Sequence, residues 1–311
     1  MIAYRQWFTD MNEYRTLIYE NSIGQKLYLT KDANSFLYDL QNMGFSYTNE
    51  ISTSEYDTWM QLERTDISRS DLSGTYLISY DSNSDIYTAK NAAEKILNYD
   101  QVLNRTRKKK VHGKLFYSNA SGRTVYAYAL LKGFEFGEIE ENEENQLSIK
   151  ISFSLLTKNW ISIEPKTFSM ELLDTDFLGH PFGHPFGHVS DAAQNNQTLI
   201  FEVSGNDVAY IVIRVYGAVT NPSLSIWNFS NPDEKYTIKY LGTVQEGSIL
   251  EINMIDMYTT VDGVNAIADF DIVNYSIPFF NLVPGKYVMN MQSDLNRGKF
   301  QIDIYDSWVS G

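Results

Sequence analysis

Three of the chain's four histidines lie in one short stretch, LGHPFGHPFGHV (178–189), and their spacing suggests a metal site. His180, His184 and His188 are four residues apart, so on a helix their imidazoles would line one face. Neutral imidazole is a common ligand of zinc and nickel. We therefore consider this stretch first as a candidate metal centre.

Two prolines argue against the helix that such a metal centre would need. Pro181 and Pro185 each follow a histidine, and proline interrupts the helical hydrogen-bond ladder and biases the preceding residue toward extended backbone. Each H-P-F-G is instead typical of a turn with proline at its second position. No acidic residue stands at the offset found in the helical zinc motif. We interpret the stretch as structural and keep the three histidines as the less favoured metal candidates.

Carboxylate pairs are the next candidates for chemistry. Asp174 with Asp176, and Asp269 with Asp271, could each be considered an acid–base pair. Such pairs are unspecific in a chain with 39 acidic residues. The sequence has no Cys, no phosphate-binding loop, no G-x-S-x-G and no H-E-x-x-H motif. It therefore predicts neither an enzyme nor a cofactor.

Two runs of opposite charge, RTRKKK (105–110) and EIEENEE (138–144), lie in the N-terminal half. In a ring of identical subunits, one run could pair with the other run of a neighbour. Two solvated loops are the favoured interpretation, because exposed ion pairs are weak. Nucleic-acid binding is not expected, since the net charge is −14 and no aromatic residue interrupts the basic run. The residues that would carry the pairing are Arg105, Lys108, Lys109, Lys110, Glu140, Glu141, Glu143 and Glu144.

The composition indicates a folded chain with room for two domains. Its 311 residues, 43% of them hydrophobic, can bury two separate cores. No apolar run reaches the roughly 18 residues of a membrane-spanning helix, and the N-terminal residues lack the apolar stretch of a secretory signal. Membrane insertion is therefore not expected. The absence of Cys fits assembly in a reducing cytosol.

Residues 1–165 are expected to form an α+β domain, in which a β-sheet packs against one helix. The helix is predicted at Thr88–Asn104, where apolar residues recur on one face, and Asp32–Met43 is expected to add one or two helical turns. The segment Leu147–Leu155 alternates strictly and predicts a half-buried antiparallel strand.

Residues 166–197 are rich in Pro, Gly and polar residues and predict a linker. The chain beyond it, 198–311, consists of short alternating segments bounded by turn dipeptides, which predicts an all-β sandwich. The expected strands are Thr198–Val203, Val208–Tyr216, Ser223–Phe229, Tyr236–Leu241, Ser248–Asn253, Lys286–Met291 and Lys299–Tyr305.

Several stretches, taken in order, resemble the distal tail protein (Dit) family of bacteriophages with long non-contractile tails. The strand end ISFSLLTKNWI (151–161) is similar to a T-K-x-W variant of that family, and HPFGHPFG to the proline–aromatic turns that separate its halves. NPSLSIWN (221–228), GSILEIN (247–253) and NLVPGKYVM (281–289) follow in the family's order. Tyr287 stands in the last of these where the family usually has Asn.

The resemblance implies a non-enzymatic protein of the virion's distal tail, without a cofactor, assembled in the cytoplasm of the bacterial host. It implies a homohexameric ring formed by an N-terminal β-sheet belt domain, followed by a galectin-like or jelly-roll sandwich. The ring would dock the tail tube protein on one side and the tail-associated lysin or baseplate hub protein on the other, and would hold receptor-binding proteins. Sheet extension between subunits makes the alternating strand an interface candidate, through Leu147, Ile149, Ile151 and Phe153.

Two alternatives remain open from the sequence. The sandwich could itself bind host-surface saccharides, for which Trp227 and Trp308 are the candidate aromatic contacts if they lie on an exposed face. A glycan-degrading enzyme would instead require two carboxylates facing each other about 5–10 Å apart across a cleft.

Overall fold

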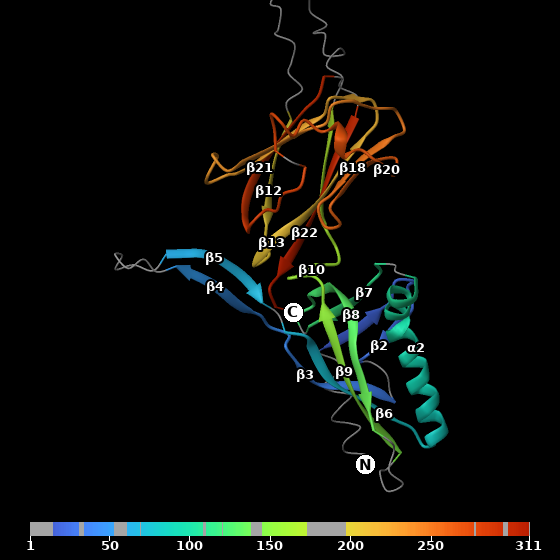
Figure 1. Ribbon diagram of the computed structural model, residues 1–311. Coiled ribbons are helices and arrows are strands. Elements are labelled where there is room, and N and C mark those ends of the chain that lie inside the picture. The colour runs from blue at the N-terminus through green and yellow to red at the C-terminus, as the bar shows by residue number, and fades with distance from the viewer. Residues whose placement is uncertain are drawn as a thin grey trace, which may run out of the picture. The chain divides into compact units, whose positions relative to one another are not determined.

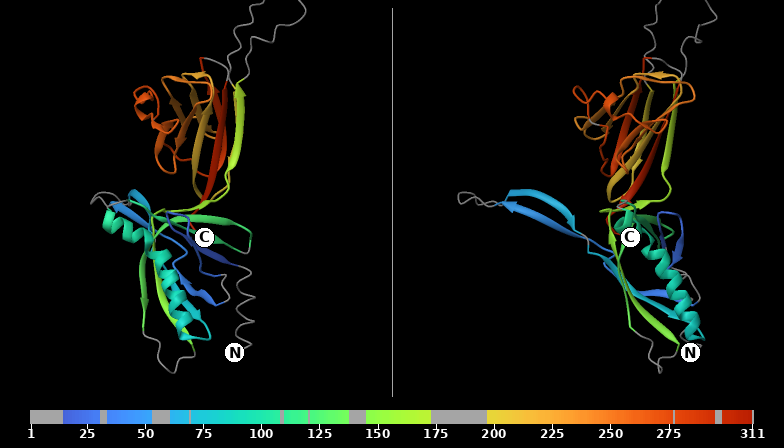
Figure 2. Two further views of the ribbon diagram at one scale, coloured as in Figure 1. Left: turned by 90° about the vertical axis from the view of Figure 1, so that its right-hand side faces the viewer. Right: turned by 45° about the vertical axis from the view of Figure 1, so that its right-hand side comes forward.

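The computed structural model describes residues 15–30, 34–52, 61–68, 70–107, 110–119, 121–137, 145–172, 197–276, 278–294 and 298–310 (Figures 1 and 2). These residues form two compact units. Unit 1 comprises the described residues of Met1–Ile163 and Trp308–Gly311, and unit 2 those of Glu164–Ser307. Each unit has its own hydrophobic core.

Unit 1 is built on an antiparallel sheet that branches at one long strand, β8 (Figure 1). One part of the sheet has the order β2-β1-β7-β8-β10, and the other continues from β8 through β9 and β6 to β3. The strands are β1 (Thr16–Glu20), β2 (Lys26–Tyr28), β3 (Ser35–Gln41), β6 (Leu72–Ser79), β7 (Gly113–Ser118), β8 (Thr124–Phe136), β9 (Gln146–Leu155) and β10 (Trp160–Ser162).

Strand β8 is long enough to pair with different neighbours along its length. Its first half pairs with β7 and its second half with β9, and the register shifts between Leu131 and Gly133. The close approach of β9 requires glycine there, because a Cβ on Gly133 would stand 2.8 Å from the Ser152 Oγ atom. The strict alternation expected for β9 is confirmed as far as Phe153.

One helix, α2 (Asn83–Arg107), lies in the described part of unit 1, and it contains the predicted segment. The helix begins earlier than expected because Ser82 caps it: the Ser82 hydroxyl accepts a hydrogen bond from the Ser84 amide at 3.2 Å. Thr88, the first residue of the predicted segment, lies inside the helix and its hydroxyl donates to the Ser84 carbonyl. Figure 1 shows α2 against the sheet, and its buried side chains are Ile86, Ala93, Leu97 and Asp100.

The helical turns expected within Asp32–Met43 are wrong, because strand β3 occupies this segment. Its apolar residues have a helical spacing, but Asp39 and Asn42 adopt positive φ angles of 51° and 65°, which no α-helix accommodates. β3 pairs with β6 and the register shifts between Tyr38 and Gln41. Pairing with β6, a long-range contact, therefore determines the structure of this segment.

Unit 2 is an all-β sandwich of two antiparallel sheets that share one core. One sheet has the order β12-β21-β15-β16, and the other runs from β11 through β22, β13, β18 and β19 to β20. The strands are β11 (Lys166–Leu172), β12 (Gln197–Val203), β13 (Asp207–Tyr216), β15 (Ser223–Asn228), β16 (Lys235–Lys239), β18 (Ile249–Asn253), β19 (Tyr258–Val261), β20 (Val264–Asn265), β21 (Gly285–Gln292) and β22 (Gly298–Trp308), with the short pair β14 (Val219–Thr220) and β17 (Thr243–Val244) beside them.

All seven strands expected in this half are present, and the boundaries of the half differ from the prediction. Strand β11 occupies the start of the expected linker and pairs with β22 over its whole length. The rest of that linker, 173–196, lies outside the described residues. The expected sandwich ends at residue 311, whereas Trp308 packs against the core of unit 1. An α+β half followed by an all-β half is thus confirmed, with changed limits.

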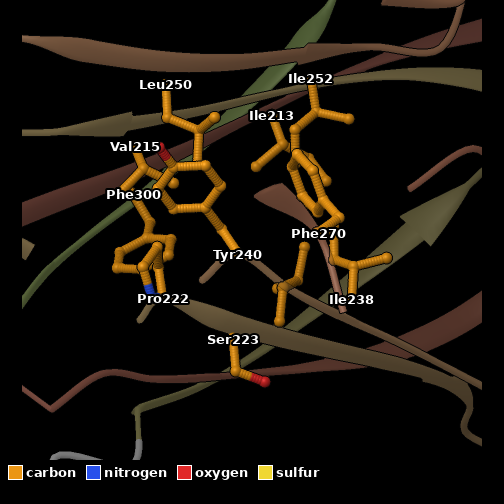
Figure 3. Close-up of a pocket in the computed structure, with 11 residues that line it drawn as sticks. Ile213, Val215, Pro222, Ser223, Ile238, Tyr240, Leu250, Ile252, Phe270 and Phe300 are labelled. Carbon is orange, nitrogen blue, oxygen red and sulfur yellow. The ribbon is translucent and has the colours of Figure 1, made fainter. Parts of the chain in front are cut away.

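The core of unit 2 is apolar and nearly filled. Figure 3 shows Ile213, Leu250 and Phe300 among the side chains around a small cavity of about 10 Å³. A cavity of that size holds at most one water molecule, and its apolar lining offers water few partners. Tyr287 lies in the same core, with its ring stacked on that of Phe201. The cavity is therefore a packing gap and not a ligand site.

Candidate functional site

The hairpin formed by β4 (Ser46–Ser52) and β5 (Gln61–Ser68) is the element of unit 1 that packs least against its own chain. The two strands form a sheet of their own, and Figures 1 and 2 show them projecting from the rest of the unit. A two-stranded hairpin is at best marginally stable alone in water. Its exposed position (Figure 1) therefore makes the hairpin a candidate contact surface.

The pairing register divides the hairpin into two chemically different faces. Successive residues of a strand point to opposite faces, and directly paired residues share one. Tyr47 pairs with Ile67, and Asn49 pairs with Thr65, on one face. The opposite face carries polar and charged pairs: Ser46 with Ser68, Thr48 with Asp66, and Glu50 with Arg64.

Aromatic side chains dominate the first face near the root of the hairpin. Tyr47 is 56% exposed, and the ring of Phe45 meets its ring edge-on at 5.2 Å between centroids. Ile67, opposite Tyr47, is half-buried. Farther out, Leu62 is 60% exposed. We call the residues Phe45, Tyr47 and Ile67 the arm patch.

Ion pairs hold the root of the hairpin in place. The Lys158 ammonium, beyond the end of β9, lies 2.8 Å from the Asp66 carboxylate on β5, and Arg64 pairs with the same carboxylate. The hydrogen bond from Lys158 holds the pKa of Asp66 below its usual range. Next to the hairpin, the Asp71 carboxylate forms an ion pair with Lys132 on β8. It also accepts a hydrogen bond from the Ser154 hydroxyl on β9 at 2.8 Å. These exposed contacts link the root of the arm to the rest of unit 1, and each is weak on its own.

Hydrogen bonds from Lys132 and Ser154 also hold the pKa of Asp71 below its usual range. Both carboxylates are therefore ionised at neutral pH, when the root contacts are complete. Sequence patterns did not reveal these pairs, because their partners are distant in the chain. The alternation in YTNEIS and LERTDIS was the available signal for the hairpin itself.

The prediction that β9 extends its sheet to a neighbouring subunit is wrong. Its outer edges are both occupied, since β9 pairs with β6 on one side and with β8 on the other. The alternation signalled burial within the unit and not a free edge. The four residues proposed as interface contacts are fully or nearly fully buried in the core of unit 1: Leu147, Ile149, Ile151 and Phe153.

The predicted charge pairing between subunits stays a prediction. Arg105 lies in the last turn of α2 and Lys110 just after it, and both are exposed. The Asn104 side chain closes this end of the helix through two hydrogen bonds with the Val111 backbone. The remaining partners lie outside the described residues: Lys108, Lys109, Glu140, Glu141, Glu143 and Glu144.

The predicted sites of chemistry are mostly outside the described part of the chain. This applies to His180, His184 and His188 and to the first aspartate pair, 174 and 176. Of the second pair, Asp271 accepts hydrogen bonds from Asn274 and so stabilises a turn. Within the described residues, no group of three His, Cys, Asp or Glu side chains is placed to hold a metal ion. None of the helices described there is long and apolar enough to cross a membrane.

The two candidate saccharide-binding tryptophans lie in different units. Trp227 is half-buried on β15 of unit 2. Trp308, at the end of β22, packs against the core of unit 1, with the guanidinium carbon of Arg123 4.7 Å from its ring centroid. Both side chains are partly buried, and the saccharide-binding role predicted for them stays a prediction.

The chain is similar to known proteins in its fold and not in its sequence. No family model matches the sequence, and no curated protein matches it. Among solved structures, the Dit protein of phage SPP1 is similar over 94% of this chain and 98% of its own, with a TM-score of 0.62 and 10% identity. The chain has the Dit fold. The resemblance to Dit seen in the sequence is thus confirmed at the level of fold.

Two further solved structures agree with the Dit fold. A chain of the phage P2 baseplate, in its activated conformation with Ca, is 15% identical with a TM-score of 0.52. The corresponding baseplate with Sr gives 15% identity and a TM-score of 0.51. These matches cover 94% of this chain and 98% and 97% of the baseplate chains. The Dit fold therefore extends across both units.

Proposed function

We propose that the protein is a structural component of a phage tail tip, located at the distal end of the tail in the virion. The observation that carries this proposal is the Dit fold across both units, covering 94% of the chain. The SPP1 protein of that fold is described as a paradigm of the hub adsorption apparatus in phages that infect Gram-positive hosts. In this role the protein acts by assembly and not by catalysis.

Within this role, the subunits form a homohexameric ring through unit 1, and unit 2 is a galectin-like sandwich on its outside. The tail tube protein docks on one side, and the tail-associated lysin or baseplate hub protein on the other, with receptor-binding proteins attached. Assembly takes place in the cytoplasm of the bacterial host. The arm patch supports contact between neighbouring subunits, because it is an aromatic surface on an element with no core of its own.

The ring is tested by the mass of the full-length protein in solution. We expect a six-chain particle by light scattering coupled to size exclusion, and a closed ring by electron microscopy. Tyr47→Asp places a charge in the arm patch and should yield mainly monomers, because a buried unpaired charge is costly. The matched control is Ser46→Asp, one residue before Tyr47 and on the opposite face, where residue 46 pairs with Ser68, and this variant should still assemble.

Monomeric wild-type protein at high concentration, with no rings by microscopy, would refute self-assembly. Equal assembly of the Tyr47→Asp and Ser46→Asp variants would show that the arm patch is not the contact. Circular dichroism of both variants checks that unit 1 stays folded.

A further inference from the structure

The outer face of the four-stranded sheet in unit 2 combines aromatic rings with positive charge. The register aligns Ile200, Val288, Trp227 and Lys235 in one row across β12, β21, β15 and β16. Ile200 is 50% exposed and Trp227 half-buried, so the row is open to solvent at several points. Residues of the core point the other way from the same strands, as Ile226 and Met289 do.

Each aromatic ring of this face has a lysine ammonium over it. The distance from Lys Nζ to ring centroid is 5.6 Å for Lys235 on Trp227 and 4.8 Å for Lys286 on Phe229. For Lys239 on Tyr275, which lies in the segment bordering β16, it is 5.9 Å. We call these six residues the lysine–aromatic face. Such pairs hold the rings and the charges in fixed relative positions.

The charge of this face is opposite to that of the chain. The outward strand positions of the sheet carry three lysines, Lys235, Lys239 and Lys286. They carry one acidic residue, Glu202, which stands opposite Lys286 in the strand register. The chain as a whole carries a net charge of −14. Because salt screens exposed charges beyond about 8 Å at physiological ionic strength, a ligand at this face meets these lysines and the acidic residues of the adjoining segments, Asp233, Glu234 and Asp271, more than the net charge of the chain.

Hydroxyl and amide groups fill the row beside the aromatic one. The Ser225 and Thr237 hydroxyls lie 2.9 Å apart, and the Asn290 amide donates to the Thr198 hydroxyl at 3.3 Å. Protein–protein interfaces are typically depleted in Lys and Ser and enriched in Arg. The outward strand positions of this sheet carry Lys, Ser and Thr and no Arg. The composition therefore favours a ligand other than a protein.

We propose that the lysine–aromatic face binds an anionic carbohydrate polymer that carries carboxylate or phosphate groups. Trp and Tyr offer a flat apolar surface with a polar tip, which suits sugar rings, and Lys recognises phosphate or carboxylate as a point charge. Lys235 and Lys239 are about 13 Å apart along β16, at ~3.3 Å per residue, a spacing that suits repeated charges of an extended chain. The site is part of unit 2 alone and does not depend on the ring.

Binding is measured on the full-length protein by microscale thermophoresis, with polygalacturonate and poly(glycerol phosphate) as anionic probes and dextran as the neutral one. We expect at least one anionic probe to bind, dextran to bind much more weakly, and affinity to fall as NaCl rises. The triple variant Lys235→Ala/Lys239→Ala/Lys286→Ala should weaken binding by about tenfold or more. Phe229→Ala, at an exposed ring, should weaken it without loss of charge.

A matched control removes the same charge elsewhere. Lys26, Lys95 and Lys150 are exposed in unit 1, and their triple alanine variant should bind as the wild type does. The two anionic probes distinguish carboxylate from phosphate recognition. The proposal is overturned if neither probe binds, if both triple variants lose affinity equally, or if single-stranded poly(dT) binds as tightly as the better glycan. None of these binding outcomes changes the ring assembly that light scattering measures. The glycan proposal and the ring proposal can therefore fail independently of each other.

Discussion

At the scale of single residues, Asp100 shows how a buried charge can organise a fold. It lies on α2 with no exposed surface. Its carboxylate accepts hydrogen bonds from the Tyr19 hydroxyl at 3.2 Å, from the Ser22 amide at 3.1 Å, and from the Ser22 hydroxyl. Burial, together with this carboxylate, raises the pKa of Tyr19. The cluster joins the helix to the turn between β1 and β2.

Asp100→Ala should lower the free energy of unfolding of unit 1 by about 3 kcal/mol, because buried donors lose their acceptor. Asp100→Asn keeps the shape and one acceptor oxygen, so it should cost less. Asp85→Ala, in the exposed first turn of the same helix, serves as control and should cost under about 1 kcal/mol. Urea denaturation followed by circular dichroism gives the three values. A loss for Asp100→Ala no larger than that for Asp85→Ala would contradict the role of the cluster.

At the scale of elements, the hairpin depends on ionised carboxylates at its root. Asp66 and Asp71 have lowered pKa values through Lys158 and Lys132. A lowered folded pKa means that the stabilisation is complete above the unfolded pKa of about 3.9 and is lost as pH falls through the folded value. The root should therefore loosen in acid and not in base.

We expect hydrogen-exchange protection of β4 and β5, corrected for intrinsic rates, to stay constant from pH 6 to about pH 4 and to fall below it, as pH drops through the lowered pKa values of Asp66 and Asp71. Lys158→Ala should give low protection already at pH 6, because Asp66 loses the lysine that ties the hairpin to the end of β9. Lys150→Ala, an exposed lysine on β9 itself, should leave protection unchanged. Equal protection in the Lys158→Ala variant and the wild type would mean that the ion pair does not hold the arm.

Elements were predictable from the sequence where one local pattern determined them. Alternation located the strands of unit 2 and β9, since burial of one face requires a period of two residues. It could not say which strands are edges, so Ile149 and Ile151 were expected at an interface and lie in the core. The segment of β3 has helical spacing, and only its pairing with β6 reveals a strand. Long-range pairs such as Lys158 with Asp66 leave no local signal at all.

At the scale of the whole molecule, the two units have separate cores and should unfold as separate cooperative transitions. Calorimetry of the full chain should resolve two peaks. Ile213→Ala, in the core of unit 2, should cost about 2–5 kcal/mol and move one peak, whereas Asp100→Ala should move the other. A single peak that shifts with both variants would contradict this independence.

The chain leaves unit 1 after Ile163 and returns to it at Trp308, which packs against the core of unit 1. Unit 2 is thus an insertion within unit 1 and not an appendage to it. Synthesis proceeds from the N-terminus, so unit 1 lacks the packing of Trp308 until residues 164–307 have been made. We expect that nascent chains cannot assemble with one another until unit 2 has been synthesised, because unit 1 is still incomplete.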